Sequence, residues 1–185
     1  KDADAYITSD VGQHQMWVAQ RFPFARPDRW LTSGGLGTMG FGLPPAIGAA
    51  LTEPAATTLC FTGDGSLLMN VQELATLAEL DLNVKIVLLD NAALGLVRQQ
   101  QELFYQRRYV ASEFSQPSRF VAFAQAFGIP AFDLGEVAEP VEALADALRC
   151  RGPVLIRVPI AATQHVLPMV APGAANTEAL DHPTL

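Results

Sequence analysis

The segment TTLCFTGDG, residues 57–65, decides the fold of this chain. Its first six residues are β-branched or apolar, which is typical of a buried strand, and apolar residues then recur at helical spacing over residues 66–80. The run VKIVLL at residues 84–89 is almost continuously apolar, as expected for a parallel strand covered on both faces. Together these pieces predict a strand, a helix and a second strand that form one βαβ crossover.

Polar residues follow both strands of this crossover. Asp64 comes directly after the first strand and Asn91 directly after the second. A right-handed crossover returns the second strand parallel to the first, so we expect both side chains at the same carboxyl edge of the sheet. Carboxylate and amide oxygens are ligands for Mg²⁺ or Ca²⁺, the glycines flanking Asp64 let the backbone approach a bulky anion, and the helix start near Ser66 offers free N–H groups to phosphate. The alternative for residues 63–65 alone is an ordinary strand-to-helix turn in which Asp64 caps the helix.

The rest of the chain alternates between strand and helix patterns. Strands are expected at residues 5–9, 30–32, 57–62, 84–90, 130–134 and 153–158, and helices at residues 13–22, 41–52, 66–80, 94–106, 117–127 and 139–149. Such alternation predicts an α/β fold of three layers, with a mainly parallel, doubly wound, six-stranded sheet between helices. We expect residues 1–160 to form this domain and residues 161–185, which lack a clear period, to be its irregular tail.

The composition predicts one cytoplasmic domain that contacts neither nucleic acid nor a membrane. The chain has 185 residues and a net charge of −7 with scattered basic residues, so it offers no basic surface to nucleic acid. No apolar run approaches the roughly 20 residues of a membrane-spanning helix. Arg98, Arg107 and Arg108 are expected on a solvated helix face. Cys60 and Cys150 lack metal-ligand spacing, which predicts packing thiols in a reducing compartment.

Several longer blocks carry a family resemblance. Gly-Asp-Gly at residues 63–65 followed by Asn91 resembles the thiamine-diphosphate motif, in which the second element is Asn-Asn, whereas this chain has Asp90 in place of the first Asn. The blocks DVGQHQMW (10–17), SGGLGTMGFGLP (33–44), MNVQEL (69–74) and VLPMVAPG (166–173) are similar to the carboxyl-terminal domain of the acetolactate synthase (acetohydroxyacid synthase) catalytic subunit. The blocks LGLVRQQQ (94–101) and AANTE (174–178) resemble the bacterial isozyme I type. Because the chain opens at Lys1 without an initiator Met, we expect it to be one excised domain of a three-domain subunit.

The resemblance implies which residues hold the cofactor. Contacts to thiamine diphosphate are expected from Gln13, His14, Gly37, Met39, Gly63, Asp64, Gly65, Ser66, Asn91, Ala93, Leu94, Gly95 and Leu96. Mg²⁺ would be bound by Asp64, Asn91 and the backbone carbonyl of Ala93, and the substrate channel would include Leu96, Val97 and Gln100. Taken alone, the Gln-His pair is more typical of a surface helix start, and Met39 of a core gap filler. Asp90 is expected to turn away from the diphosphate, toward a backbone N–H or a helix terminus, because like charges repel.

The resemblance also implies an activity. Enzymes of this family decarboxylate pyruvate and condense the two-carbon unit with a second 2-oxo acid, in branched-chain amino acid biosynthesis. Their catalytic Glu lies in another domain, usually of a second catalytic subunit, so no catalytic residue is expected here and the domain alone should be inactive. FAD belongs to a middle domain, and a small regulatory subunit is expected as a partner. The alternatives are a related carboligase or acetyltransferase, or a non-catalytic nucleotide-binding domain.

One position bears on substrate choice. Many family members carry Trp where this chain has Gln100, and a smaller polar amide should weaken an apolar grip on an ethyl group. We therefore expect little preference for 2-oxobutyrate over pyruvate as the second substrate. The alternative is that Gln100 is simply an exposed helix residue.

Overall fold

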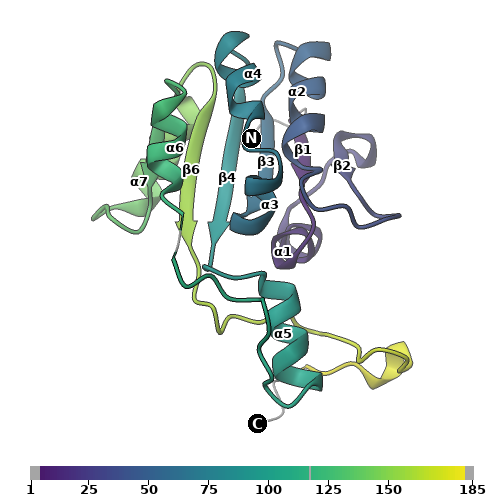
Figure 1. The fold of residues 1–185 in the computed structure, drawn as a ribbon. Coiled ribbons are helices and arrows are strands. Elements are labelled where there is room, and N and C mark those ends of the chain that lie inside the picture. The colour runs from purple at the N-terminus through teal and green to yellow at the C-terminus, as the bar shows by residue number, and fades with distance from the viewer. Residues whose placement is uncertain (1–4, 117, 182–185) are drawn as a thin grey trace.

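The computed structural model describes residues 5–116 and 118–181, and its centre is a six-stranded parallel sheet (Figure 1). The strand order is β2-β1-β3-β4-β6-β5. The strands are β1 (Tyr6–Ser9), β2 (Trp30–Thr32), β3 (Thr58–Gly63), β4 (Val84–Asp90), β5 (Ala131–Asp133) and β6 (Val154–Pro159). Every pairing between neighbouring strands is parallel. The predicted α/β fold with a doubly wound, six-stranded sheet is confirmed.

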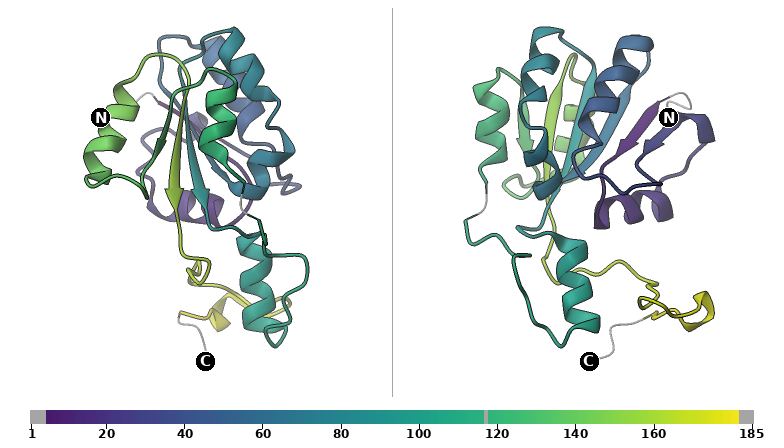
Figure 2. Two further views of the ribbon diagram at one scale, coloured as in Figure 1. Left: turned by 60° about the vertical axis from the view of Figure 1, so that its left-hand side comes forward. Right: turned by 45° about the vertical axis from the view of Figure 1, so that its right-hand side comes forward.

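The described residues form seven α-helices, and all but α5 cover the two faces of this sheet. They are α1 (Gln13–Arg21), α2 (Leu43–Thr52), α3 (Asp64–Met69), α4 (Glu73–Glu79), α5 (Gly95–Phe104), α6 (Phe120–Ala126) and α7 (Pro140–Arg149), with short 3₁₀ helices at Pro27–Arg29 and Asn176–Glu178. The larger apolar core joins α2, α3, α4 and α6 to one face of the sheet. The smaller core joins α7 to the other face, on which α1 also lies (Figure 2). Four of the six strands, β3, β4, β5 and β6, contribute residues to both cores, which explains why β4 reads as a continuous apolar run.

The prediction of one continuous helix at residues 66–80 is wrong. The structure divides it into α3 and α4, and α3 begins at Asp64 directly after the strand, without an intervening turn. Asn70 interrupts the helix, because its side chain donates a 2.6 Å hydrogen bond to the carbonyl oxygen of Gly40. The N-cap position is occupied by Gly63, and no side chain caps this helix. The interpretation of Asp64 as a helix cap is therefore wrong.

Helix α5 is set apart from the helical layers. It lies beyond the carboxyl ends of β4 and β6, and the segment after β6 runs beside it (Figures 1 and 2). Arg98 of α5 is buried and joins three segments: it pairs with Glu102 at 2.7 Å and Glu113 at 2.9 Å, and it donates to the carbonyl oxygen of Ala162. The expectation that Arg98 lies on a solvated face is wrong, although Arg107 and Arg108 are exposed.

A buried lysine ties the sheet to the end of α7. Lys85 of β4 is 1% exposed, and its Nζ donates to the carbonyl oxygens of Cys150 at 2.7 Å and Gly152 at 2.6 Å. Burial lowers the pKa of this amine, but the two carbonyls satisfy its charged form. Among the described residues, no helix has the length and apolar character needed to cross a membrane.

Candidate functional site

Three loops meet at the carboxyl edge of the sheet, where the strand order changes direction. The chain leaves β1 toward β2 on one side and later returns to place β3 on the other side of β1. Such a switch point leaves a crevice between the loops that follow the two strands, and ligands of open α/β sheets bind there. The segments that follow β1, β3 and β4 supply Gln13, Asp64 and Asn91 to this crevice, and Gln13 and Asp64 are the first residues of α1 and α3.

The crevice contains a cavity of about 180 Å³. All thirteen residues predicted to contact the cofactor line it, together with Val97. Gln100 does not line it and is exposed on α5. The lining residues that sequence reasoning missed are Val11, Gly12, Trp17, Leu89 and Ile160. Four of these are apolar or glycine and carry no chemical signal, so only their neighbours in the chain could have pointed to them.

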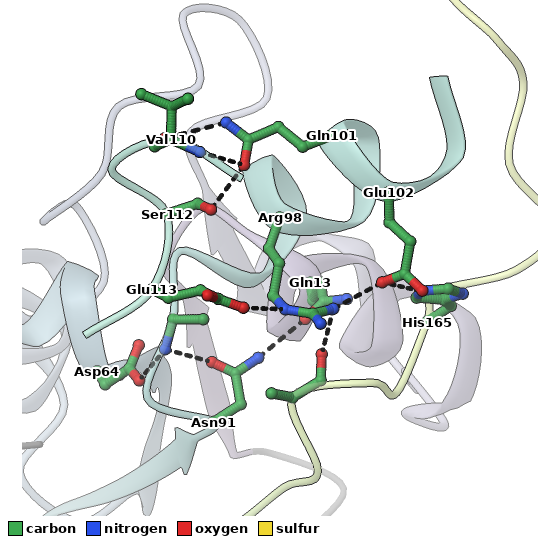
Figure 3. A network of polar contacts seen from close by, with 12 residues as sticks. Gln13, Asp64, Asn91, Arg98, Gln101, Glu102, Val110, Ser112, Glu113 and His165 are labelled. Carbon is green, nitrogen blue, oxygen red and sulfur yellow. Dashed lines mark hydrogen bonds and ion pairs between the residues drawn. The ribbon is translucent and has the colours of Figure 1, made fainter. Parts of the chain in front are cut away.

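Two predicted ligand oxygens converge on one point of the crevice (Figure 3). The backbone N–H of Ala93 lies 3.1 Å from Asp64 Oδ2 and 3.2 Å from Asn91 Oδ1. The second oxygen of Asp64 accepts a 2.7 Å hydrogen bond from the N–H of Gly65. Ala92 has a positive φ of 54°, which turns the chain after β4 so that Ala93 faces Asp64. The carboxylate oxygen and the amide oxygen therefore lie close together, because both accept from the same backbone N–H.

The electrostatics of Asp64 suit a cation. Its side chain is 3% exposed. Burial, and then the nearby Asp90 carboxylate, raise the pKa of Asp64 to about 6, although the hydrogen bonds from Gly65 and Ala93 act in the opposite direction. Burial makes the ionised form of this carboxylate costly when it is alone, and a divalent ion bound beside it offsets that cost.

His14 is buried at the wall of the same crevice, and one of its two ring nitrogens has no hydrogen-bond partner among the described residues. Its imidazole lies between Gly12 and Gly63, where a Cβ added to either glycine would come within 2.9 Å of the ring. The Nε2 atom is buried and has no hydrogen-bond partner among the described residues. Burial lowers the pKa of His14 to about 4, so the ring is neutral at pH 7. The ring donates its one proton to the backbone carbonyl of Asp10, so Nε2 of the neutral ring is an acceptor. It becomes a donor to an anion only when the ring is protonated or changes its tautomer.

A chain of amide side chains fixes the position of Asn91. The Nδ2 of Asn91 donates to Gln13 Oε1 at 3.1 Å, and Gln13 Nε2 in turn donates to Gln99 Oε1 at 2.8 Å and to the carbonyl oxygen of Gln164. This chain links α1, α5 and the tail around the crevice. Gly95 permits the arrangement, because a Cβ there would overlap Gln13 Oε1.

Asp10 anchors the glycine-rich turn that brings Gly37 and Met39 to the cavity. It is 1% exposed, and its carboxylate accepts hydrogen bonds from the N–H groups of Gly40 at 2.8 Å and Gly42 at 3.1 Å. Sequence reasoning did not single out Asp10. Its place directly after a strand, like that of Asp64, was the available signal.

Asp90 turns toward a backbone N–H, as predicted. Its Oδ1 accepts a hydrogen bond from the N–H of Ala92 at 3.2 Å. Its Oδ2 accepts a 2.6 Å charge-assisted hydrogen bond from Arg157 Nε. Arg157 lies on β6, and no pattern in the sequence pointed to this ion pair.

The donor set fits a divalent cation together with an anion. Among the described residues, no group of three or more His, Cys, Asp and Glu side chains is placed to hold a metal. The convergence of one carboxylate and one amide oxygen instead suits a cation that takes its other oxygens from a ligand and from water. The unused His14 Nε2 and the close-packed glycines provide the surroundings for an anionic ligand.

Comparisons with known proteins agree with this chemistry. Residues 10–158 match the family model described as thiamine pyrophosphate enzyme, C-terminal TPP binding domain. The chain is 56% identical over 177 residues to the acetolactate synthase isozyme 1 large subunit of Escherichia coli K12, covering 96% of this chain and 32% of that protein. It is 48% identical over 181 residues to the isozyme 2 large subunit of the same organism, covering 98% and 33%. It is 45% identical over 176 residues to the acetolactate synthase large subunit of Porphyra purpurea, covering 95% and 30%.

The matches confirm the resemblance expected from the sequence motifs. The chain spans about a third of the length of the curated relatives that it matches. The family match includes the loops after β1, β3 and β4 that form the crevice. The chain therefore belongs to the family of thiamine pyrophosphate enzymes, as a C-terminal TPP-binding domain.

Proposed function

We propose that this chain is the cofactor-binding domain of an acetolactate synthase catalytic subunit. The whole enzyme would decarboxylate pyruvate and condense the two-carbon unit with a second 2-oxo acid, in branched-chain amino acid biosynthesis. The observation that carries the proposal is the convergence of Asp64 Oδ2 and Asn91 Oδ1 on one point of the crevice. It occurs in a chain that shares about half its residues with the large subunits of two such enzymes.

The roles of the residues follow from their positions. We assign Mg²⁺ to Asp64, Asn91 and the carbonyl oxygen of Ala93. We assign diphosphate contacts to Gln13, to His14 through Nε2, and to the N–H groups after Gly63. Gln13 would have to release Gln99 or the carbonyl of Gln164 in order to donate, and His14 would donate with Nε2 protonated. Thiamine diphosphate, when bound, supplies the electron sink for decarboxylation and carboligation. The side chains of this domain hold and neutralise the diphosphate, and Met39 and Leu96 give apolar support beside it.

The rest of the catalytic machinery would come from other protein. The cavity of about 180 Å³ is smaller than the roughly 300–1,000 Å³ of complete ligand pockets, which supports a site completed by another domain. We place the catalytic Glu in that domain, in a second catalytic subunit, and FAD on a middle domain. A small regulatory subunit is a further proposed partner. Within this chain we propose residues 1–160 as the cofactor domain and residues 161–185 as its tail. Both cysteines are free, which supports a cytoplasmic location.

Titration calorimetry tests the cofactor assignment. The protein should bind thiamine diphosphate only when Mg²⁺ is present, and it should not bind ADP with Mg²⁺. Preferential binding of ADP would favour a nucleotide-binding domain instead. Binding of thiamine diphosphate without acetolactate formation by the full-length enzyme would favour a related carboligase or acetyltransferase.

Gln100 is proposed to influence the choice of second substrate in the full-length enzyme. It lies one turn after Leu96 and Val97, which line the cavity, and therefore on the same side of α5. Competition between equal concentrations of pyruvate and 2-oxobutyrate should show little preference, and Gln100→Trp should increase the preference for 2-oxobutyrate. A strong bias toward 2-oxobutyrate in the unaltered enzyme would contradict this role.

A further inference from the structure

Two carboxylates lie side by side behind the proposed metal site. Asp64 follows β3 and Asp90 ends β4, and the register of these adjacent strands pairs Gly63 with Leu89, the residues just before them. Both side chains are buried. The two carboxyl groups act on each other through their charges and through a side-chain hydrogen bond. The second carboxylate is a departure from the motif, which this chain otherwise resembles, because an uncharged Asn is expected at position 90.

Arg157 forms an ion pair with Asp90. Its Nε donates to Asp90 Oδ2 at 2.6 Å, and its Nη1 donates to Asp133 Oδ2 at 2.8 Å. Arg157 lies opposite Leu88 in the pairing of β4 with β6 and opposite Asp133 in the pairing of β5 with β6. The guanidinium is thus fixed at two points, one on each side of its own strand. A planar donor held in this way cannot turn toward the crevice and serve as a phosphate ligand.

We propose that Arg157 is a positioning residue for the metal site, which pairs with the Asp90 carboxylate beside Asp64 so that Asp64 is the one unpaired charged side chain left to bind the metal. This inference rests on the proposed function. The hydrogen bond from Ala92 to Asp90 is 3.2 Å long and comes from a neutral group, so it orients the carboxylate without neutralising it. Arg157 contributes the opposite charge.

The arrangement matters because the ligand arrives as a metal complex with net negative charge. A diphosphate carries more negative charge than one Mg²⁺ neutralises. A site with two free carboxylates attracts a bare divalent ion more strongly, but it repels the metal–diphosphate complex. A site with one carboxylate accepts the complex. Arg157 therefore sets the preference of the crevice for the complex over the bare ion.

Removal of Arg157 should change two affinities in opposite directions. In the intact protein that contains this chain, Arg157→Met should weaken the binding of thiamine diphosphate at saturating Mg²⁺ by about tenfold or more, and it should tighten the binding of Mn²⁺ alone by about threefold or more. Calorimetry measures the first affinity and electron paramagnetic resonance of free Mn²⁺ measures the second. Adding Asp90→Asn to Arg157→Met should return both affinities to within about threefold of the unaltered protein.

Control variants separate this role from simple loss of stability. Arg157→Lys keeps the charge but not the planar two-point geometry, so both affinities should lie between those of the unaltered protein and those of Arg157→Met. Arg149→Met, which removes an exposed pair with Asp146, should change neither. If Arg157→Met fails to fold, recovery of the fold and of both affinities by the added Asp90→Asn supports the same role.

Several results would overturn the inference. They are a parallel loss of both affinities in Arg157→Met, no change in either, failure of Asp90→Asn to restore them, or an equal defect in Arg157→Lys. If the unaltered protein shows no magnesium-dependent binding of thiamine diphosphate, the proposed function fails and this inference fails with it. If the unaltered protein does bind thiamine diphosphate with Mg²⁺ and one of the other results is found, the proposed function stands and only the role of Arg157 is overturned.

Discussion

At the scale of single residues, the burial of His14 has a consequence for stability. Its pKa is about 4 in the folded chain and near 6.5 when it is exposed. Between these values the unfolded chain binds more protons, so the free energy of unfolding should fall as the pH falls from 6.5 to 4, by about 3 kcal/mol in total.

Denaturant unfolding of the unaltered chain and of His14→Gln at several pH values measures this contribution. The difference between the two proteins cancels the contributions of the other titrating groups. It should be constant above pH 7 and change by about 3 kcal/mol down to pH 4. Parallel pH profiles would show that His14 is not buried in its neutral form.

Asp64→Asn should separate cofactor binding from stability. The amide keeps an oxygen that can accept from Gly65 or Ala93 but loses the charge that a cation needs. Changes around metal ligands cost roughly 10–100-fold in affinity, so loss of a ligand charge should weaken magnesium-dependent binding of thiamine diphosphate by at least about 100-fold. The thermal midpoint without ligands should not fall, because a buried carboxylate has been replaced by a neutral group. Calorimetry and thermal unfolding measure the two effects, and a large drop in the midpoint would assign Asp64 a mainly structural role.

Gly95→Ala should displace the amide chain that holds Asn91. The new Cβ would overlap Gln13 Oε1 and lie 2.5 Å from Asn91 Nδ2, so one of these side chains must move. Cofactor affinity should fall by about tenfold or more. Gly48→Ala is the matched control, because a Cβ at this exposed position of α2 meets no atom within 4 Å and should stabilise the helix by about 0.5–1 kcal/mol. Equal effects of the two variants would argue against the amide chain as an orienting device.

The residues of the site differ in how far they can be predicted from the sequence. Asp64 and Asn91 are recognisable because each follows a buried strand within one crossover, a local pattern. The pairing of Asn91 with Gln13 and that of Asp90 with Arg157 join residues 78 and 67 positions apart. Such contacts depend on how the strands are ordered in the sheet, and the strand patterns do not encode that order.

At the scale of elements, Arg98 should control how firmly α5 is held. It joins α5 to Glu113 of the following loop and to Ala162 of the segment after β6 (Figure 3). Arg98→Met leaves Glu102 without this partner and should destabilise the region by about 1–3 kcal/mol. Hydrogen exchange should become faster in residues 105–116 and 160–170 while β3 and β4 stay protected. Arg149→Met removes an exposed ion pair and should leave both segments unchanged, whereas uniform acceleration over the whole sheet would contradict a local role for Arg98.

The helices and strands show where hydrophobic periodicity is sufficient to predict the bounds of an element. The strands at residues 30–32 and 84–90 have the predicted bounds, because their apolar runs end at polar or turn residues. The helix at residues 66–80 does not, since Leu67, Val71 and Leu74 keep their spacing through the break. The break depends on the hydrogen bond from Asn70 to Gly40, a residue of a distant turn. A periodic pattern records which side chains face the core, and it does not record whether the backbone between them is continuous.

At the scale of the whole molecule, the divided site predicts that this chain has no activity alone. With thiamine diphosphate, Mg²⁺ and pyruvate, the purified chain should form no acetolactate, because the group that activates the cofactor is proposed to lie in other protein. The full-length subunit under the same conditions is the positive control. Measurable turnover by the chain alone would contradict the divided site.

The burial of Lys85 also affects how the molecule can be handled. The sequence contains two lysines, Lys1 and Lys85, and the amine of Lys85 is enclosed by the carbonyls of Cys150 and Gly152. Acylating reagents and amine-reactive resins should therefore leave Lys85 of the folded chain unmodified. Acylation at Lys85 requires the sheet to open, so its rate reports the opening of β4. That rate follows the population of the open form when reclosing is fast, and the opening rate when acylation is faster than reclosing.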